Sequence, residues 1–180
     1  MADENDRFYF DTAAVWKFYR DEEGSLNIRR LVSNLSYPVL VSPLTILEFV
    51  SVLMKDHRKR YLKQRMVRRI IKRIRRDTAG AIRYFTVIPV DEASYRRAER
   101  ILLEHGNHYS IGSNDALHLA IVENARSTFR NITFVTSDHS LKNVCEKLVP
   151  DQKSFDKCGP PRIAVAACSA RMFLINGVGK

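Results

Sequence analysis

The sequence predicts an α/β fold in which helices cover both faces of a parallel sheet. Short apolar runs that suit buried strands alternate along the chain with longer segments whose apolar residues recur at helical spacing. Alternation of this kind favours parallel pairing, because each helix carries the chain back across the sheet. At 180 residues, of which 45% are apolar, the chain can form one domain with a substantial core.

The elements are predicted from apolar runs, helical spacing and capping residues. Short polar side chains can cap a helix, because they satisfy the free N–H groups of its first turn. The candidate caps are Asp11 with Thr12, Ser25, Thr45 and Asp91. The predicted elements, in order, are a strand at 7–10, helices at 13–19 and 26–35, a strand at 39–42, a helix from Pro43, a basic helix at 58–76, a strand at 85–90, helices at 92–105 and 116–125, a strand at 132–136 and a helix at 139–148.

The C-terminal part of the chain has a weaker pattern. Gly159-Pro160-Pro161 suggests a break, so we expect a main domain over 1–158 and an extension over 159–180. The extension has two apolar stretches, which leave open an edge strand or a loosely held tail. The chain contains no run of 18 apolar residues that could span a membrane, and its N-terminus has no apolar signal core. The three cysteines are widely spaced and suggest no disulfide framework, so we expect a cytoplasmic protein.

The positive charge of the chain is concentrated in one segment. Of its 30 Lys and Arg residues, 12 lie between Lys55 and Arg76, where Asp56 is the one acid, while the whole chain carries +10. A cationic stripe of this kind is typical of a polyanion-binding surface, although a solvated helix face or a surface for an acidic protein also fits. Within it, Leu62, Met66, Ile70 and Ile74 fall four apart and predict a narrow apolar stripe.

Four carboxylates occur where a strand gives way to a helix or one turn inside a helix: Asp11, Glu48, Asp115 and Asp138. The carboxyl ends of parallel strands meet at one edge of the sheet, so these acids are expected to converge there. Capping explains Asp11, Asp115 or Asp138 taken singly. Glu48 sits between Leu47 and Phe49 on a mostly apolar helix, where an unpaired carboxylate is costly to bury.

Converging carboxylates favour a hard divalent cation, Mg²⁺ or Mn²⁺, which relieves their mutual repulsion. The five histidines lack zinc spacing, and the chain shows neither a glycine-rich phosphate loop nor a nucleophile triad. Metal-assisted hydrolysis of a phosphodiester fits this set of residues, with the ion activating water and one carboxylate serving as a general base. We expect Trp16 and Phe18, on the helix after the first strand, in the core, although aromatic side chains beside Asp11 could also contact a base.

Four segments resemble PIN-domain ribonucleases, in the order and approximate spacing of that family. They are Phe8-Tyr9-Phe10-Asp11-Thr12, Leu44-Thr45-Ile46-Leu47-Glu48-Phe49, Asn114-Asp115-Ala116-Leu117-His118-Leu119-Ala120 and Phe134-Val135-Thr136-Ser137-Asp138. The likeness covers roughly residues 7–148 and is greatest to VapC-type toxins of toxin–antitoxin pairs. The resemblance implies a three-layer α/β/α fold with a central parallel sheet of four to five strands, and an Mg²⁺- or Mn²⁺-dependent endoribonuclease.

The resemblance also implies a site and partners. Asp11, Glu48, Asp115 and Asp138 would form the catalytic metal site, with Thr12, Ser137, Asn114 and Thr136 as supporting polar neighbours. The substrate would be an RNA such as tRNA or rRNA, the partners an antitoxin and a second copy of the chain. The basic helix departs from the compact toxin pattern by its unusual charge, which leads us to expect contacts with RNA or a protein partner through Arg58, Arg65, Arg68, Arg69, Lys72 and Arg73. The alternative is a PIN-fold RNA-binding or RNA-processing protein without an antitoxin.

Overall fold

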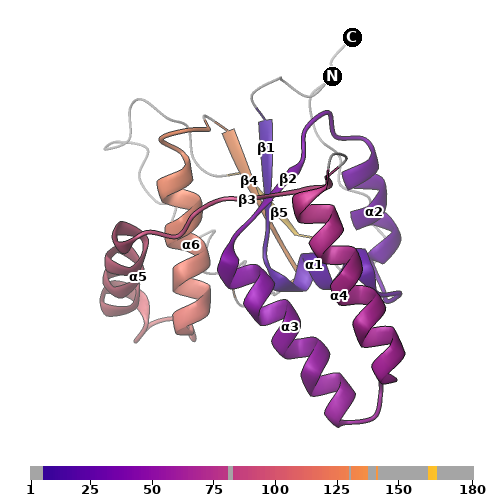
Figure 1. Cartoon of the computed structure of the whole chain (residues 1–180). Helices are drawn as coiled ribbons and strands as arrows, with labels where there is room; N and C mark the ends of the chain where they lie inside the picture. Colours follow the sequence, from indigo (N-terminus) through magenta and orange to yellow (C-terminus); the bar gives the residue numbers. More distant parts are fainter. Residues whose placement is uncertain (1–5, 81–82, 130, 138–140, 142–161, 166–180) are drawn as a thin grey trace.

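A wholly parallel five-stranded sheet forms the middle layer of the protein (Figure 1). The computed structural model describes residues 6–80, 83–129, 131–137, 141 and 162–165. The strands are β1 (Asp6–Phe10), β2 (Val39–Val41), β3 (Phe85–Val87), β4 (Asn131–Thr136) and β5 (Arg162–Val165). Their order is β3-β2-β1-β4-β5, with Tyr9 opposite Leu40 on one side of β1 and Phe134 on the other. The predicted parallel pairing is confirmed.

Six helices in the described part cover the two faces of this sheet. They are α1 (Thr12–Tyr19), α2 (Ser25–Ser33), α3 (Pro43–Arg58), α4 (Gln64–Ala79), α5 (Glu92–His105) and α6 (Ser113–Ala125). Successive side chains of β1 point to opposite faces: Phe10 packs in a core with α1 to α4, and Tyr9 packs in a second core with α5 and α6. The predicted three-layer α/β/α architecture is therefore confirmed.

The basic segment forms parts of two helices rather than one. α3 continues through Arg58, residues 59–63 make a turn, and α4 begins at Gln64, so the predicted start of the basic helix at 58 is wrong. The turn contains neither Gly nor Pro, so no residue that typically breaks a helix marks it. Arg60 takes up the change of direction with a φ of 61°, and the Tyr61 N–H donates to the Asp56 carbonyl at 2.9 Å.

The predicted apolar stripe of this segment is partly correct. Leu62, Ile70 and Ile74 are buried in the core, but Met66 is 38% exposed and Val67 is buried in its place. A four-residue repeat drifts around a helix that has 3.6 residues per turn. Val67, Ile70 and Ile74 all lie on the side of α4 that faces the core, and Met66 lies outside that side.

Smaller differences concern the ends of other elements. β3 ends at Val87 instead of residue 90. The N-cap of α3 is Ser42, whose Oγ accepts the Thr45 N–H at 3.2 Å, so Thr45 is its partner in a capping box rather than the cap. The predicted helix at 139–148 lies outside the described residues except for buried Leu141.

The C-terminal extension contributes at least one strand. β5 pairs with β4 at the edge of the sheet, with Phe134 opposite Ile163. The boundary near 158 stays a prediction. In the described part of the chain, none of the helices is long and apolar enough to cross a membrane.

Candidate active site

A cleft of about 330 Å³ opens where α1, α3 and α6 meet beside the carboxyl ends of the strands. Three of the four predicted acids line it: Asp11, Glu48 and Asp115. Its walls are completed by Thr12, Ala13, Trp16, Glu22, Val52, His118 and Leu141. Acids that are 37 and 67 residues apart along the chain are thus brought into one cavity by the parallel topology. Asp138 lies outside the described residues.

Asp11 serves as a helix cap and lines the cleft at the same time. It follows the last residue of β1, its N–H donates to the Val135 carbonyl at 3.2 Å, and its side chain is almost fully buried. One carboxylate oxygen, Oδ1, accepts the Ala14 N–H at 2.8 Å. The N-terminal end of α1 carries a partial positive charge, which stabilises an ionised carboxylate there. Capping and a place in the site are therefore compatible roles for one residue.

Glu48 lies at the centre of a hydrogen-bond network that joins all three helices. Its Oε1 accepts from the Asn114 amide at 2.6 Å, and its Oε2 accepts from the Thr12 hydroxyl and from His118 Nε2 at 3.0 Å. Burial by itself raises the pKa of Glu48, but the hydrogen bonds from His118 and Thr12 and the charge of His118 outweigh it, so the pKa is lowered. Glu48 is held as an oriented, ionised carboxylate.

His118 connects Glu48 to a buried chain of hydroxyl groups that the sequence analysis missed. Its Nδ1 is 2.8 Å from the Tyr9 hydroxyl, which donates to Ser42 Oγ at 2.9 Å. Because a carboxylate only accepts, the Nε2 atom that faces Glu48 carries a proton. Burial raises the pKa of Tyr9, so its hydroxyl stays protonated. This series of hydrogen-bonded side chains runs from Glu48 in the cleft to Ser42, the N-cap of α3.

A spacing signal was available for His118. It follows Asn114 by four residues and Asp115 by three, and residues at these separations share one face of a helix. A side chain on that face of α6 points toward the cleft that Asp115 lines. Tyr9 gave no comparable signal, since an apolar strand position explains it fully.

Asp115 is held at the first turn of α6. Its Oδ2 accepts the Gly112 N–H at 3.0 Å, while Asp115 also lines the cleft. A Cβ atom at Gly112 would lie 3.3 Å from Oδ2, so a larger residue would crowd this carboxylate. The predicted place of Asp115 in the first helical turn is confirmed.

The supporting residues fall into two groups. Thr12 and Asn114 both donate to Glu48. Thr136 is fully buried at the end of β4 and Ser137 is partly buried, but neither lines the cleft. The basic candidates Arg58, Arg65, Arg68, Arg69, Lys72 and Arg73 lie at the end of α3 or on α4, away from the cleft lining.

Trp16 lines the cleft as well as packing in the core. Its ring meets Phe49 edge-on at 5.8 Å, and its indole N–H donates to Glu22 Oε2 at 3.1 Å. The expected core packing is confirmed for both Trp16 and Phe18, and Trp16 in addition lines the cleft. Trp16 gives the cleft a flat aromatic wall beside Asp11.

The donors in the cleft suit a hard divalent cation. Within the described ranges, no three His, Cys, Asp or Glu side chains form a ready metal-binding group. The chemistry of Asp11, Glu48 and Asp115 nevertheless fits, because carboxylate oxygens are the ligands that Mg²⁺ and Mn²⁺ prefer. Glu48 has about four acceptor positions, and three of them receive hydrogen bonds. One position is left for an ion or for an ion-bound water.

Comparisons with known proteins agree with this architecture. A family model described as PIN domain matches residues 8–147. FitAcB from Neisseria gonorrhoeae matches with a TM-score of 0.55 and 17% identity, over 76% of this chain and 91% of that one. VapC20 from Mycobacterium tuberculosis, described as a sarcin-ricin loop cleaving toxin, matches with a TM-score of 0.52 and 16% identity, over 69% and 86% of the two chains.

A toxin–antitoxin complex from Klebsiella pneumoniae also matches, with a TM-score of 0.51 and 16% identity, over 88% of this chain and 97% of that one. No curated protein matches the chain. At identities this low, the solved structures establish a shared fold.

Proposed function

Because the chain belongs to the PIN-domain family, we propose that it is a metal-dependent endoribonuclease and the toxin of a toxin–antitoxin pair. The observation that carries the proposal is the meeting of Asp11, Glu48 and Asp115 in one cleft. A protein that only bound RNA would gain nothing from negative charge directed at phosphate. The likeness to VapC20 and to a toxin–antitoxin complex supports the toxin assignment.

In this proposal, Asp11, Glu48 and Asp115, together with Asp138, hold Mg²⁺ or Mn²⁺. The bound ion would lower the pKa of a water molecule, polarise the scissile phosphate and stabilise the leaving oxygen. Thr12, Asn114 and His118 fix the Glu48 carboxylate in one orientation, which avoids the cost of ordering it during the reaction. Because its pKa is lowered, Glu48 acts as a charged ligand or positioner and not as a proton donor.

The walls of the cleft fit a nucleotide substrate. Trp16 and Val52 add apolar surface to the cleft that the acids line. An aromatic wall offers a face on which a base can stack, and such stacking tolerates every base. The carboxylates would then lie near the phosphate that follows the stacked base.

Asp11→Asn and Asp115→Asn test the proposal. Both variants should lose RNA cleavage while keeping their thermal stability, because an Asn carbonyl oxygen can still accept the Ala14 or the Gly112 N–H but binds a divalent ion poorly. Total RNA is incubated with each protein in Mg²⁺ and in chelator, and the new RNA ends are sequenced. Full cleavage by Asp11→Asn would remove the mechanism.

Asp91→Asn is the matched control. Asp91 caps α5 as Asp11 caps α1, since its Oδ1 accepts the Ser94 N–H at 2.9 Å, but it does not line the cleft. This variant carries the same chemical change at the same kind of position, and we expect it to cleave like the parent. A comparable loss in Asp91→Asn would mean that helix capping, and not the site, explains the result.

We also propose an antitoxin and a second copy of the chain as partners. Leu47, Tyr95 and Leu103 on α3 and α5 are 70%, 60% and 75% exposed, and large apolar side chains of this kind favour a protein contact. Sedimentation equilibrium of the parent and of Leu47→Glu/Leu103→Glu would report the dimer. Relief of toxin-induced growth arrest by a neighbouring small gene would report the antitoxin.

A further inference from the structure

We propose that the exposed side of α4 docks the phosphate backbone of double-helical RNA, at a distance from the cleft. We call this surface the cationic face of α4. Its members are exposed Lys and Arg side chains on the helix or at its N-cap: Lys63, Arg65, Arg68, Arg69, Lys72 and Arg75. The identity of the polyanion as RNA rests on the proposed function. The existence of the surface does not.

The cationic face lacks compensating acids. The one acid on α4, Asp77, is 1% exposed and lies beneath the helix, where it accepts from the Tyr19 hydroxyl and from Arg76 at 3.0 Å and lies 3.7 Å from Arg73. Arg73 and Arg76 are therefore tied to a structural cluster. Among the residues that the structure describes, no carboxylate lies within ion-pairing distance of the six cations of the face.

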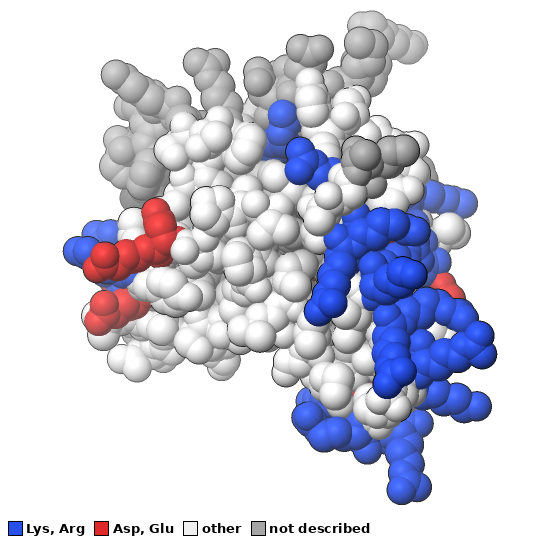
Figure 2. Space-filling view, viewed as in Figure 1, with Lys and Arg blue, Asp and Glu red and all other residues white. Residues whose placement is uncertain are grey.

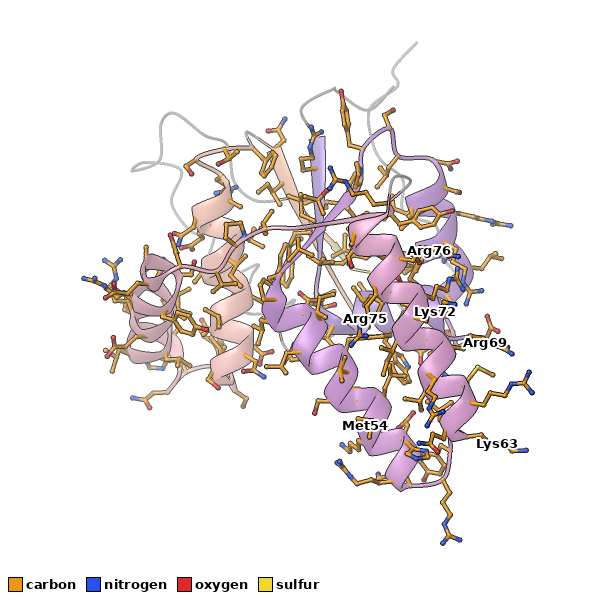
Figure 3. The ribbon with its side chains drawn as sticks, viewed as in Figure 1. Met54, Lys63, Arg69, Lys72, Arg75 and Arg76 are labelled. Atoms are coloured by element: carbon orange, nitrogen blue, oxygen red, sulfur yellow. The ribbon has the colours of Figure 1, made fainter. Side chains whose placement is uncertain are left out.

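The cations form a continuous field and not isolated charges. Figure 2 shows Lys and Arg gathered over the side of the molecule where α3 and α4 lie, and acids near α5 on the opposite side. In Figure 3, Lys63, Arg69 and Lys72 follow one another along the outer side of α4, and Arg75 lies toward α3. Pairs such as Arg65–Arg69 and Arg68–Lys72 are four residues apart, where like charges destabilise a helix. A polyanion would relieve that repulsion.

Packing of α4 argues against a protein as the occupant. Its apolar side chains Val67, Ile70 and Ile74 are buried in the core, and Met66 is the one large apolar side chain that the helix leaves exposed. The centre of a protein interface is apolar and depleted of charged residues other than Arg, which there accompanies aromatic and apolar side chains that this face lacks apart from Met66. The stripe that would have received a partner helix is already used to hold α4 on the protein.

The composition of α4 further selects double-helical RNA over single strands. Residues 64–79 include no Phe, Tyr or Trp, so α4 itself offers no ring on which an unpaired base can stack, and exposed Tyr61 lies in the turn before the helix. Arg and Lys at regular intervals along about 15 Å of straight helix suit a regular phosphate backbone. Double-helical RNA is recognised chiefly through its backbone and shape.

The position of α4 defines what the face does for the reaction. Glu48 and Val52 line the cleft from α3, and α4 packs against α3 (Figure 1). The cationic face is thus separated from the cleft by about the width of one helix, roughly 10 Å. An RNA stem held there would present a neighbouring unpaired segment to the acids. The face therefore selects substrates by a stem that flanks the cut.

Binding is tested in an Asp11→Asn background, so that cleavage does not interfere. The probes are a labelled RNA hairpin and an unstructured strand of equal length and composition. In Arg65→Gln/Arg69→Gln/Lys72→Gln/Arg75→Gln we expect hairpin affinity to fall by at least about tenfold near 0.15 M salt and the salt slope to fall by about 3 to 4, as four lost phosphate contacts predict. Affinity for the unstructured strand should change much less.

Two further comparisons make the test specific. Gln keeps a helix propensity close to that of Arg and Lys, so α4 should remain folded, which circular dichroism would check. Arg96→Gln/Arg100→Gln on α5 removes two exposed charges elsewhere and should leave hairpin binding unchanged, unlike the matched Arg69→Gln/Lys72→Gln. With Asp11 restored, the fourfold variant should raise KM for hairpin-bearing RNA and leave kcat unchanged.

Several results would overturn the inference. Equal hairpin affinity and salt slope in the parent and the fourfold variant would show that the face binds no RNA. Unchanged RNA affinity combined with lost binding to an acidic peptide would assign the face to a protein. Equal losses for hairpin and strand would remove the preference for a double helix. If the Asp11→Asn proteins bind as expected but the parent cuts no RNA, the docking surface stands and the proposed function fails.

Discussion

Replacing His118 tests whether the buried chain behind Glu48 holds the site together. In His118→Leu, Glu48 loses a donor at 3.0 Å and Tyr9 loses a partner at 2.8 Å. A hydrogen bond to a charged group contributes about 1.5–3 kcal/mol and a neutral one about 1 kcal/mol. The Glu48 side chain is 22% exposed and can be partly rehydrated, and Tyr9 keeps Ser42. We therefore expect a loss of about 2–3 kcal/mol in the free energy of unfolding.

His118→Gln is the conservative control, because its amide can still donate to Glu48. We expect it to lose about 1 kcal/mol, chiefly from the contact with Tyr9. Urea unfolding measures both values. Removal of a residue that orients a metal ligand typically lowers metal affinity by about 10–100-fold, so Mn²⁺ titration calorimetry should show that loss in His118→Leu and a smaller loss in His118→Gln. If His118→Leu has the same free energy of unfolding and the same Mn²⁺ affinity as the parent, the hydrogen bonds through His118 do not support Glu48.

Two other predictions use the same buried polar groups. Asp77→Ala should lower the free energy of unfolding by about 3 kcal/mol. This value is near the low end for a broken buried pair, because Arg76 is 67% exposed and can reach water. Asp77→Asn keeps an acceptor for Tyr19 and should lose less stability, and equal losses in the two variants would count against a role for that hydrogen bond. The pKa of Glu48 is lowered in the folded protein, so its contribution to stability is present above the ordinary carboxyl pKa and is lost as the pH falls through the folded value. The melting temperature of the parent should therefore fall more steeply than that of Glu48→Gln as the pH is lowered below the ordinary carboxyl pKa of 4.5, and parallel curves would contradict this reasoning.

The order of strands and helices was predictable because period and capping are local signals. Asp11 shows this well: an acid directly after an apolar strand and before a helical pattern fixes both the boundary and the edge of the sheet. The turn at 59–63 was not predictable, because it depends on Arg60 adopting a left-handed conformation that its own residue type disfavours. The turn joins α3 and α4, which pack against each other, and such packing is not written in a local pattern.

The site was predictable to the extent that topology alone determines it. Asp11 and Asp115 follow from the ends of elements, and Glu48 follows from the cost of burying its charge. The partners of Glu48 depend on how α1, α3 and α6 cross, which brings Thr12, Asn114 and His118 within hydrogen-bond distance. The family resemblance named Thr12 and Asn114 as supporting residues, whereas His118 was missed, although its spacing from Asn114 and Asp115 was a signal for it.

The two sides of α4 are subject to independent constraints. The inner side of α4 holds the helix in the core through Val67, Ile70 and Ile74. The exposed side, which carries Arg65 and Arg69, contributes little to folding. Substitutions on the outer side can accumulate in evolution without endangering the protein or altering the carboxylates. Relatives that keep the inner pattern and vary the outer one would be free to change which molecules they engage while retaining identical chemistry.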